Sequence, residues 1–220
     1  WQKDYQDALR VAAKLNIPLI RLDFTKEYKK LVLDYMYKEY KLGRTPNPDV
    51  LCNKFIKFGV WLKATKKLGF DKLATGHYAK LSQKSIKSKV HKVRLLQAKD
   101  ENKDQTYFLN QLTQDQLKPV LFPLGNYLKS EVRSLARKFN LPTAEKEESM
   151  GICFVGEVNM KDFLKTKIKI KIGEGVTSDG TVVGKHDGLA FYTIGQRHFG
   201  ERGTGKEERG GSKPLYVVGK

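Results

Sequence analysis

The predicted fold depends on residues 72–78, which read Lys-Leu-Ala-Thr-Gly-His-Tyr. The first four of these residues are typical of a short buried strand, and the glycine directly after them ends the strand in a turn. Helical patterns of apolar residues precede this strand at residues 5–15, at about 26–42 and at 51–62, and residues 17–22 read as one more strand. Helices and strands therefore alternate, which predicts an α/β fold with a mainly parallel sheet.

The second half of the chain continues this order and then changes character. We expect a polar surface loop over residues 82–92, a strand over 93–96, and helices over about 104–112 and 130–139. From about residue 158 onward, glycines separate short alternating runs. Such spacing predicts a small second module that is rich in β-structure.

Charge and cysteine content limit the classes of function. The 220-residue chain has 42 Lys and Arg residues against 24 Asp and Glu residues, a formal net charge of +18. This surplus favours a polyanionic partner, RNA or DNA, with Lys-rich helix faces that only aid solubility as the alternative. No stretch approaches the ~18 consecutive apolar residues of a membrane span. Cys52 and Cys153 are the only cysteines, so a disulfide-rich scaffold and a paired-thiolate zinc site are excluded.

The first cysteine follows a helix start. Asn47 can cap this helix, Pro48 suits its first position, and Asp49 and Cys52 project from the same side of the opening turn. The helix dipole and Lys54 favour a thiolate, whereas Asp49 opposes it. This combination suits a thiol that passes protons or holds a polar substrate; an inert buried cysteine is the alternative.

The second cysteine, Cys153, follows Gly151 between apolar residues and suits either a core strand or a reactive turn. Because Cys52 and Cys153 are the only thiols and each lies beside a turn, the pair suits a relay that forms a transient disulfide.

Polar residues follow the strand at 72–75 and reappear before the helix expected at 104–112. Gly76 would allow close approach of a nucleotide, and His77 suits contact with a phosphate or a base. Lys103, Asp104 and Gln105 open the later helix with groups able to contact RNA. The alternatives are a structural histidine and ordinary helix capping.

Five segments taken together resemble, in order, the signatures of the tRNA-specific 2-thiouridylases. They are residues 43–53 (Gly-Arg-Thr-Pro-Asn-Pro-Asp-Val-Leu-Cys-Asn), 74–79 (Ala-Thr-Gly-His-Tyr-Ala), 102–105 (Asn-Lys-Asp-Gln), 151–154 (Gly-Ile-Cys-Phe) and 192–197 (Tyr-Thr-Ile-Gly-Gln-Arg). These segments extend over almost the whole chain.

The resemblance implies a fold and a domain order. Residues 1–157 would form part of a PP-loop ATP pyrophosphatase-type catalytic domain, also called adenine nucleotide alpha hydrolase-like, with a parallel sheet. Residues 158–212 would form the small β-rich central domain, and residues 213–220 would begin a C-terminal β-barrel. The implied location is the cytoplasm, with the mitochondrial matrix as the alternative.

The resemblance also implies a reaction, the replacement of the C2 oxygen of the wobble uridine of tRNA by sulfur. ATP, with Mg²⁺, would adenylate that oxygen. Cys153 would carry a persulfide loaded by an upstream donor, a cysteine desulfurase relay. Cys52 would attack this persulfide or close a transient disulfide with Cys153, and Asp49 would handle protons. No structural metal is implied.

The remaining site residues are carried over by motif position. Contact with the target base is implied for Asn47, Pro48 and Asp49, an ATP site for Gly76, and contact with tRNA for His77, Lys103, Asp104 and Gln105.

The family's Ser-Gly-Gly-x-Asp-Ser ATP loop would lie upstream of the first helix, and this sequence does not contain it. We therefore expect a longer native protein, and we expect this chain alone not to adenylate RNA. Two other functions stay open: a non-catalytic tRNA-binding remnant, and a thiol sulfur carrier unrelated to RNA. The two cysteines favour the enzyme over the tRNA-binding remnant. The basic charge favours the enzyme over the sulfur carrier.

Overall fold

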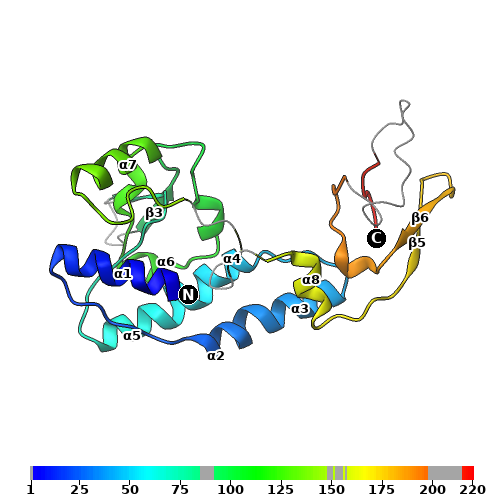
Figure 1. The fold of residues 1–220 in the computed structure, drawn as a ribbon, viewed down its shortest axis with the longest axis horizontal. Helices are drawn as coiled ribbons and strands as arrows, with labels where there is room; N and C mark the ends of the chain where they lie inside the picture. The colour runs from blue at the N-terminus through cyan, green and yellow to red at the C-terminus, as the bar shows by residue number, and fades with distance from the viewer. Residues whose placement is uncertain (1, 85–91, 148–150, 152–155, 157, 198–214) are drawn as a thin grey trace. The chain divides into compact units, whose positions relative to one another are not determined.

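The computed structural model describes residues 2–84, 92–147, 151, 156, 158–197 and 215–220 (Figure 1). The chain divides into two compact units. The first unit comprises residues 1–32 and 48–156, and the second comprises residues 33–47 and 157–220.

A long helical stretch begins in the first unit and continues into the second, as predicted for residues 26–42. It consists of α2 (Thr25–Tyr28), the π-helical segment η1 (Lys29–Leu33) and α3 (Asp34–Lys41). Buried side chains recur every four residues along it, at Tyr28, Val32, Met36 and Tyr40. That spacing gives one apolar stripe on a helix. Gly43, with φ +74°, adopts the left-handed conformation that commonly follows a helix end.

A second long helical stretch lies in the first unit. It begins with α4 (Pro48–Leu51), continues as the π-helical segment η2 (Cys52–Trp61) and ends with α5 (Leu62–Lys67). The side-chain amide of Gln116 donates hydrogen bonds to the carbonyl oxygens of Lys54, at 2.8 Å, and Phe58, at 3.0 Å. An inserted side chain of this kind supports a locally widened helix.

The core of the first unit packs around short strands. β1 (Leu73–Ala74) pairs in parallel with β4 (Val120–Leu121), and β2 (Lys80–Lys84) pairs antiparallel with β3 (Lys92–Leu96). The buried cluster between these strands and the second helical stretch is Phe58, Leu62, Leu73, Ala79, Leu109 and Val120. The predicted strands at 72–75 and 93–96 are therefore confirmed.

The other elements of the first unit surround this core. They are α1 (Gln2–Leu15), η3 (Thr106–Leu109), α6 (Gln114–Leu117), η4 (Pro123–Asn126) and α7 (Lys129–Lys138). The helix α7 confirms the prediction for residues 130–139.

Three local predictions are wrong. Residues 17–22 form no strand, because no neighbouring strand among the described residues bonds to them, and Ile17 and Ile20 are about half exposed. Residues 82–84 belong to β2 rather than to a loop, because they pair with β3. The helix expected at 104–112 is only the 3₁₀ turn η3, because the side chains of Asp104 and Gln105 bond to other segments.

The second unit combines α3 with α8 (Met160–Lys165), the hairpin β5 (Gly173–Val176) and β6 (Val182–His186), and η5 (Leu189–Phe191). Its buried cluster is Met36, Tyr40, Leu164 and Ile168. The hairpin agrees with the glycine-separated runs read from the sequence, whereas α8, which Asn159 caps, was not predicted. The expected domain boundaries stay predictions, since residues 157 and 198–214 lie outside the described residues. Among the helices described, none is long and apolar enough to cross a membrane.

Candidate active site

The loop that follows β1 holds a buried histidine. The Thr75 hydroxyl lies 2.8 Å from Nδ1 of His77, and the imidazole ring packs against Phe58 and Phe122 at centroid distances of 5.7 and 5.8 Å. Burial, with the nearby charge of Lys57 adding to it, lowers the pKa of His77 to about 4. The ring is therefore neutral near pH 7, and it can hydrogen-bond to a base or a hydroxyl but cannot pair with a phosphate as a cation.

Gly76 is exposed at the end of β1. A Cβ atom at this position would meet only Leu124 Cδ1, at an ordinary 3.8 Å. Packing within the protein therefore does not require glycine here. The open space beside Gly76 fits the approach of a nucleotide to the backbone.

The Lys103–Gln105 segment is joined to the His77 loop by a reciprocal pair of hydrogen bonds. The backbone N–H of Tyr78 donates to Gln105 Oε1 at 3.0 Å, and the backbone N–H of Gln105 donates to the Tyr78 carbonyl at 2.9 Å. Asp104 accepts from the Ala98 N–H at 2.8 Å and also from the Thr106 hydroxyl. The structure therefore engages Asp104 and Gln105 in shaping the loop, and half-buried Lys103 precedes them.

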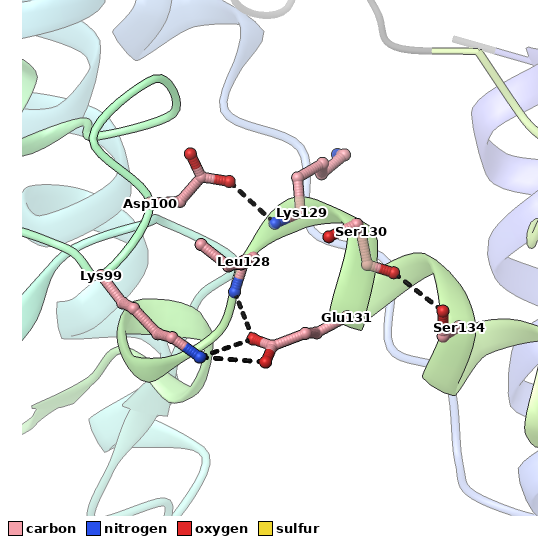
Figure 2. Close-up of polar contacts among 7 residues, drawn as sticks. All are labelled: Lys99, Asp100, Leu128, Lys129, Ser130, Glu131 and Ser134. Carbon is pink, nitrogen blue, oxygen red and sulfur yellow. Dashed lines mark hydrogen bonds and ion pairs between the residues drawn. The ribbon is translucent and has the colours of Figure 1, made fainter.

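The start of α7 is hydrogen-bonded to the segment that carries Lys99 and Asp100 (Figure 2). The Lys129 N–H donates to Asp100 Oδ2 at 2.8 Å, and the Leu128 N–H donates to Glu131 Oε2 at 2.6 Å. The Lys99 ammonium bonds to both Glu131 oxygens, at 2.9 and 3.0 Å. The bond from Leu128 and the bond from Lys99 hold the pKa of Glu131 below its usual value.

Sequence reasoning missed both acids. A carboxylate in the first turn of the expected helix is a signal that could have pointed to Glu131. No local signal indicates Asp100, because its partner Lys129 lies 29 residues further along the chain.

The residues around the first cysteine differ in exposure. Asn47 is exposed, Pro48 and Asp49 are half-buried, and Cys52 at the start of η2 is fully buried. Lys54, expected to favour a thiolate, donates instead to Gln111 Oε1 at 3.2 Å.

The negative charges of Asp49 and Asp104 both affect the pKa of one tyrosine, Tyr107. The turn η3 packs against α4, and Tyr107 on η3 is 57% exposed. Partial burial raises the pKa of Tyr107, and the negative charges of Asp49 and Asp104 raise it further. The structure therefore brings two predicted site segments, 47–52 and 103–105, together around this ring.

Asn53 connects η2 to the same turn. Its side chain is 2% exposed, and its Nδ2 donates to the Phe108 carbonyl at 3.3 Å. Its Oδ1 has no hydrogen-bond partner among the described residues. Of the two polar groups of the Asn53 amide, the described residues therefore satisfy the Nδ2 donor and not the Oδ1 acceptor.

The second predicted thiol, Cys153, lies outside the described residues. Its proximity to Cys52 and its role stay predictions. Within the described ranges, no group of three or more His, Cys, Asp or Glu residues is arranged to hold a metal ion.

Comparison with known proteins first defines the class. Residues 1–157 match the family described as tRNA methyl transferase HUP domain, and residues 161–220 match the family described as tRNA methyl transferase PRC-barrel domain. These matches confirm the expected adenine nucleotide alpha hydrolase-like fold and assign the second module to the PRC-barrel class.

Individual relatives then define the family. Over 218 residues, or 99% of this chain, it is 52% identical to the tRNA-specific 2-thiouridylase MnmA of Listeria monocytogenes serovar 1/2a (strain EGD-e). It is 50% identical over the same share to the protein of that name from Bacillus subtilis (strain 168). The chain belongs to the MnmA family of tRNA 2-thiouridylases, as its motifs predict. It spans about half the length of these relatives, 56% in each case.

Proposed function

We propose that the whole protein is a tRNA sulfurtransferase that makes 2-thiouridine at the wobble position. The observation that carries this proposal is the identity of 52% to a relative named as a tRNA-specific 2-thiouridylase, with Asp49 and Cys52 present at the start of the α4–η2 helix of this chain. The family description speaks of methyl transfer, which needs no persulfide. The two thiols of this chain favour sulfur transfer, because only cysteine holds a second sulfur.

The proposed chemistry balances with two thiols. The terminal sulfur of a Cys153 persulfide attacks C2 of the activated uridine, and the bond from C2 to the adenylated oxygen breaks with AMP as leaving group. The Cys52 thiolate then attacks the Cys153 sulfur. The persulfide S–S bond breaks, sulfur stays on C2, and a Cys52–Cys153 disulfide forms that an external thiol reduces.

Several residues of this chain would serve the substrates. The open backbone at Gly76 would contact ATP, which activates the uridine oxygen together with Mg²⁺. Asn47, Pro48 and Asp49 would hold the target base, with Asp49 receiving its proton. Because Cys52 is fully buried, attack requires the segments around its thiol to admit the Cys153 sulfur.

The partners follow from charge and chemistry. The net charge of +18 supports binding of tRNA through its phosphates. The neutral His77 would hydrogen-bond to the RNA, and Lys103 would contact it by charge. A persulfide donor of the cysteine desulfurase type would load Cys153. The named relatives come from bacteria, and we propose the cytoplasm as the location.

The proposal is tested by thiolation in vitro with the full-length protein, ATP, tRNA and a persulfide source that transfers its outer sulfur to Cys153. Cys153→Ser and Cys52→Ser should each abolish 2-thiouridine, measured by mass spectrometry of digested tRNA, while tRNA affinity stays within about twofold. Asp115→Asn, an exposed acid on α6, is the control and should thiolate normally. Full thiolation by Cys153→Ser would contradict the proposal.

A further inference from the structure

Asp100 is a buried acid in the loop that connects β3 to η3. Its residue is 9% exposed, and the same loop carries Lys103, one of the residues proposed to contact tRNA. None of the five sequence motifs includes Asp100. A buried carboxylate is costly unless it is hydrogen-bonded, so its partners indicate why it is there.

The two carboxylate oxygens of Asp100 bind two different segments. Oδ2 accepts from the N–H of Lys129 at 2.8 Å, and Lys129 is the first residue of α7 (Figure 2). The first N–H groups of a helix have no partner within the helix, and a negative charge is favourable at that end. Oδ1 accepts from the N–H of Asn102 at 3.2 Å. Asp100 therefore joins its own loop to the start of α7.

A backbone bond closes the turn that ends at Lys103. The Lys103 N–H donates to the Asp100 carbonyl at 3.2 Å. Beyond the turn, the loop is fixed again, because Asp104 accepts from Ala98 and Gln105 bonds to Tyr78. Residues 100–103 thus form a turn whose orientation depends on the hydrogen bonds of Asp100.

We propose that Asp100 is a positioning residue for tRNA binding, which fixes the 100–103 turn against α7 and thereby directs Lys103 toward the RNA. This inference rests on the proposed function, from which it takes the contact between Lys103 and tRNA.

The sign of the effect separates positioning from simple electrostatics. Replacing Asp100 with alanine removes a negative charge close to the expected RNA surface. Charge alone would then strengthen binding of the polyanion. Positioning predicts the opposite, weaker binding, because Lys103 loses its fixed direction.

Glu131 supplies the matched control. It is the second acid at the same end of α7, and it binds the Leu128 N–H and the Lys99 ammonium rather than the turn at Asn102 and Lys103. Glu131→Ala should lower the melting temperature as a lost cap does, yet tRNA affinity should not fall, because this variant too removes only a negative charge.

The experiment measures tRNA dissociation constants of the full-length protein at several salt concentrations, with melting temperatures recorded for each variant. Lys103→Ala should reduce the slope of log K against log[salt] by about 0.7–0.9, the contribution of one phosphate contact. Asp100→Ala should weaken binding and reduce the slope similarly, and the double variant should bind within about twofold of Lys103→Ala. If Asp100→Ala unfolds, Asp100→Asn keeps one acceptor and should show a smaller loss in the same direction.

Three results would overturn the inference: tRNA binding by Asp100→Ala as tight as that of the parent, additive losses in the double variant, or unchanged binding by Lys103→Ala. Loss of affinity in Glu131→Ala equal to that in Asp100→Ala would also overturn it, because α7 stability would then be the cause. If the unsubstituted protein binds no tRNA, the proposed function itself fails.

Discussion

The two units of the chain differ in what they bury. The buried polar residues among those described are Asn53, His77 and Asp100, and all three belong to the first unit. In the second unit, the cluster of Met36, Tyr40, Leu164 and Ile168 is apolar apart from one phenol. Buried polar groups cost stability unless they are satisfied, so they indicate where side chains are held in fixed directions. The first unit is built to position groups, and the described part of the second unit is held mainly by apolar packing.

The sharpest test of the tightly fitted first unit is Gly125→Ala. A Cβ atom at this position would lie 2.0 Å from the Ala79 carbonyl oxygen, so the backbone must move. We expect a loss of more than about 3 kcal/mol in unfolding free energy, measured by urea titration. In the second unit, Gly180→Ala meets no atom within 4 Å and has only its positive φ to strain it. This control should lower the unfolding free energy by about 1–2 kcal/mol. Equal losses at the two sites would contradict the tighter packing around Gly125.

Apolar packing in the second unit is tested by Leu164→Ala. Leu164 is 1% exposed, and its truncation should cost about 2–5 kcal/mol by leaving a cavity. Hydrogen exchange should rise in α8 and α3 and stay unchanged around β1 and β4. Increased exchange at β1 and β4 as well would show that the two units unfold as one.

The buried histidine predicts a pH dependence confined to the first unit. The folded pKa of His77, about 4, lies below its ordinary value of 6.5, so the unfolded chain binds more protons between these values. Stability should therefore be full above pH 6.5 and fall by up to about 3 kcal/mol as the pH drops to 4. Trp61 lies at the end of η2 in the first unit, so its fluorescence reports the unfolding of this unit. His77→Gln should reduce the loss of stability between pH 6.5 and pH 4. An unchanged pH dependence of stability in that variant would assign this loss to other groups.

The smallest effect is expected at a half-buried group of ion pairs in the second unit. Asp187 forms ion pairs with Lys161 at 2.7 Å and Lys165 at 3.4 Å, which hold its pKa below the usual value. Asp187→Asn should cost less than about 1 kcal/mol, because these side chains are only partly buried and such ion pairs contribute little. A larger loss, measured by thermal unfolding at low and high salt, would show that the second unit also depends on fixed polar contacts.

The sequence predicts several helices and strands correctly and distant polar contacts poorly. The helix at 130–139 follows from apolar spacing and flanking residues, and the strand at 72–75 from its apolar run before a glycine. The 104–112 helix fails because Asp104 and Gln105 bond to Ala98 and Tyr78, segments that helix propensity does not consider.

The site shows the same limit. Asp49, Cys52 and His77 are recognisable from motifs, but full burial of Cys52 and the lowered pKa of His77 depend on packing between segments far apart in the sequence. Asp100 could not be found this way, since its partner lies in α7.

The central claim is that the polar first unit transfers sulfur through its two thiols. Its most direct test is mass spectrometry of peptides from the full-length protein, loaded beforehand with a persulfide on Cys153, after a single turnover with ATP and tRNA and no reductant. A peptide pair linked by a Cys52–Cys153 disulfide, in an amount equal to the thiolated tRNA, is the predicted result. Thiolated tRNA formed while both cysteines remain reduced would contradict it.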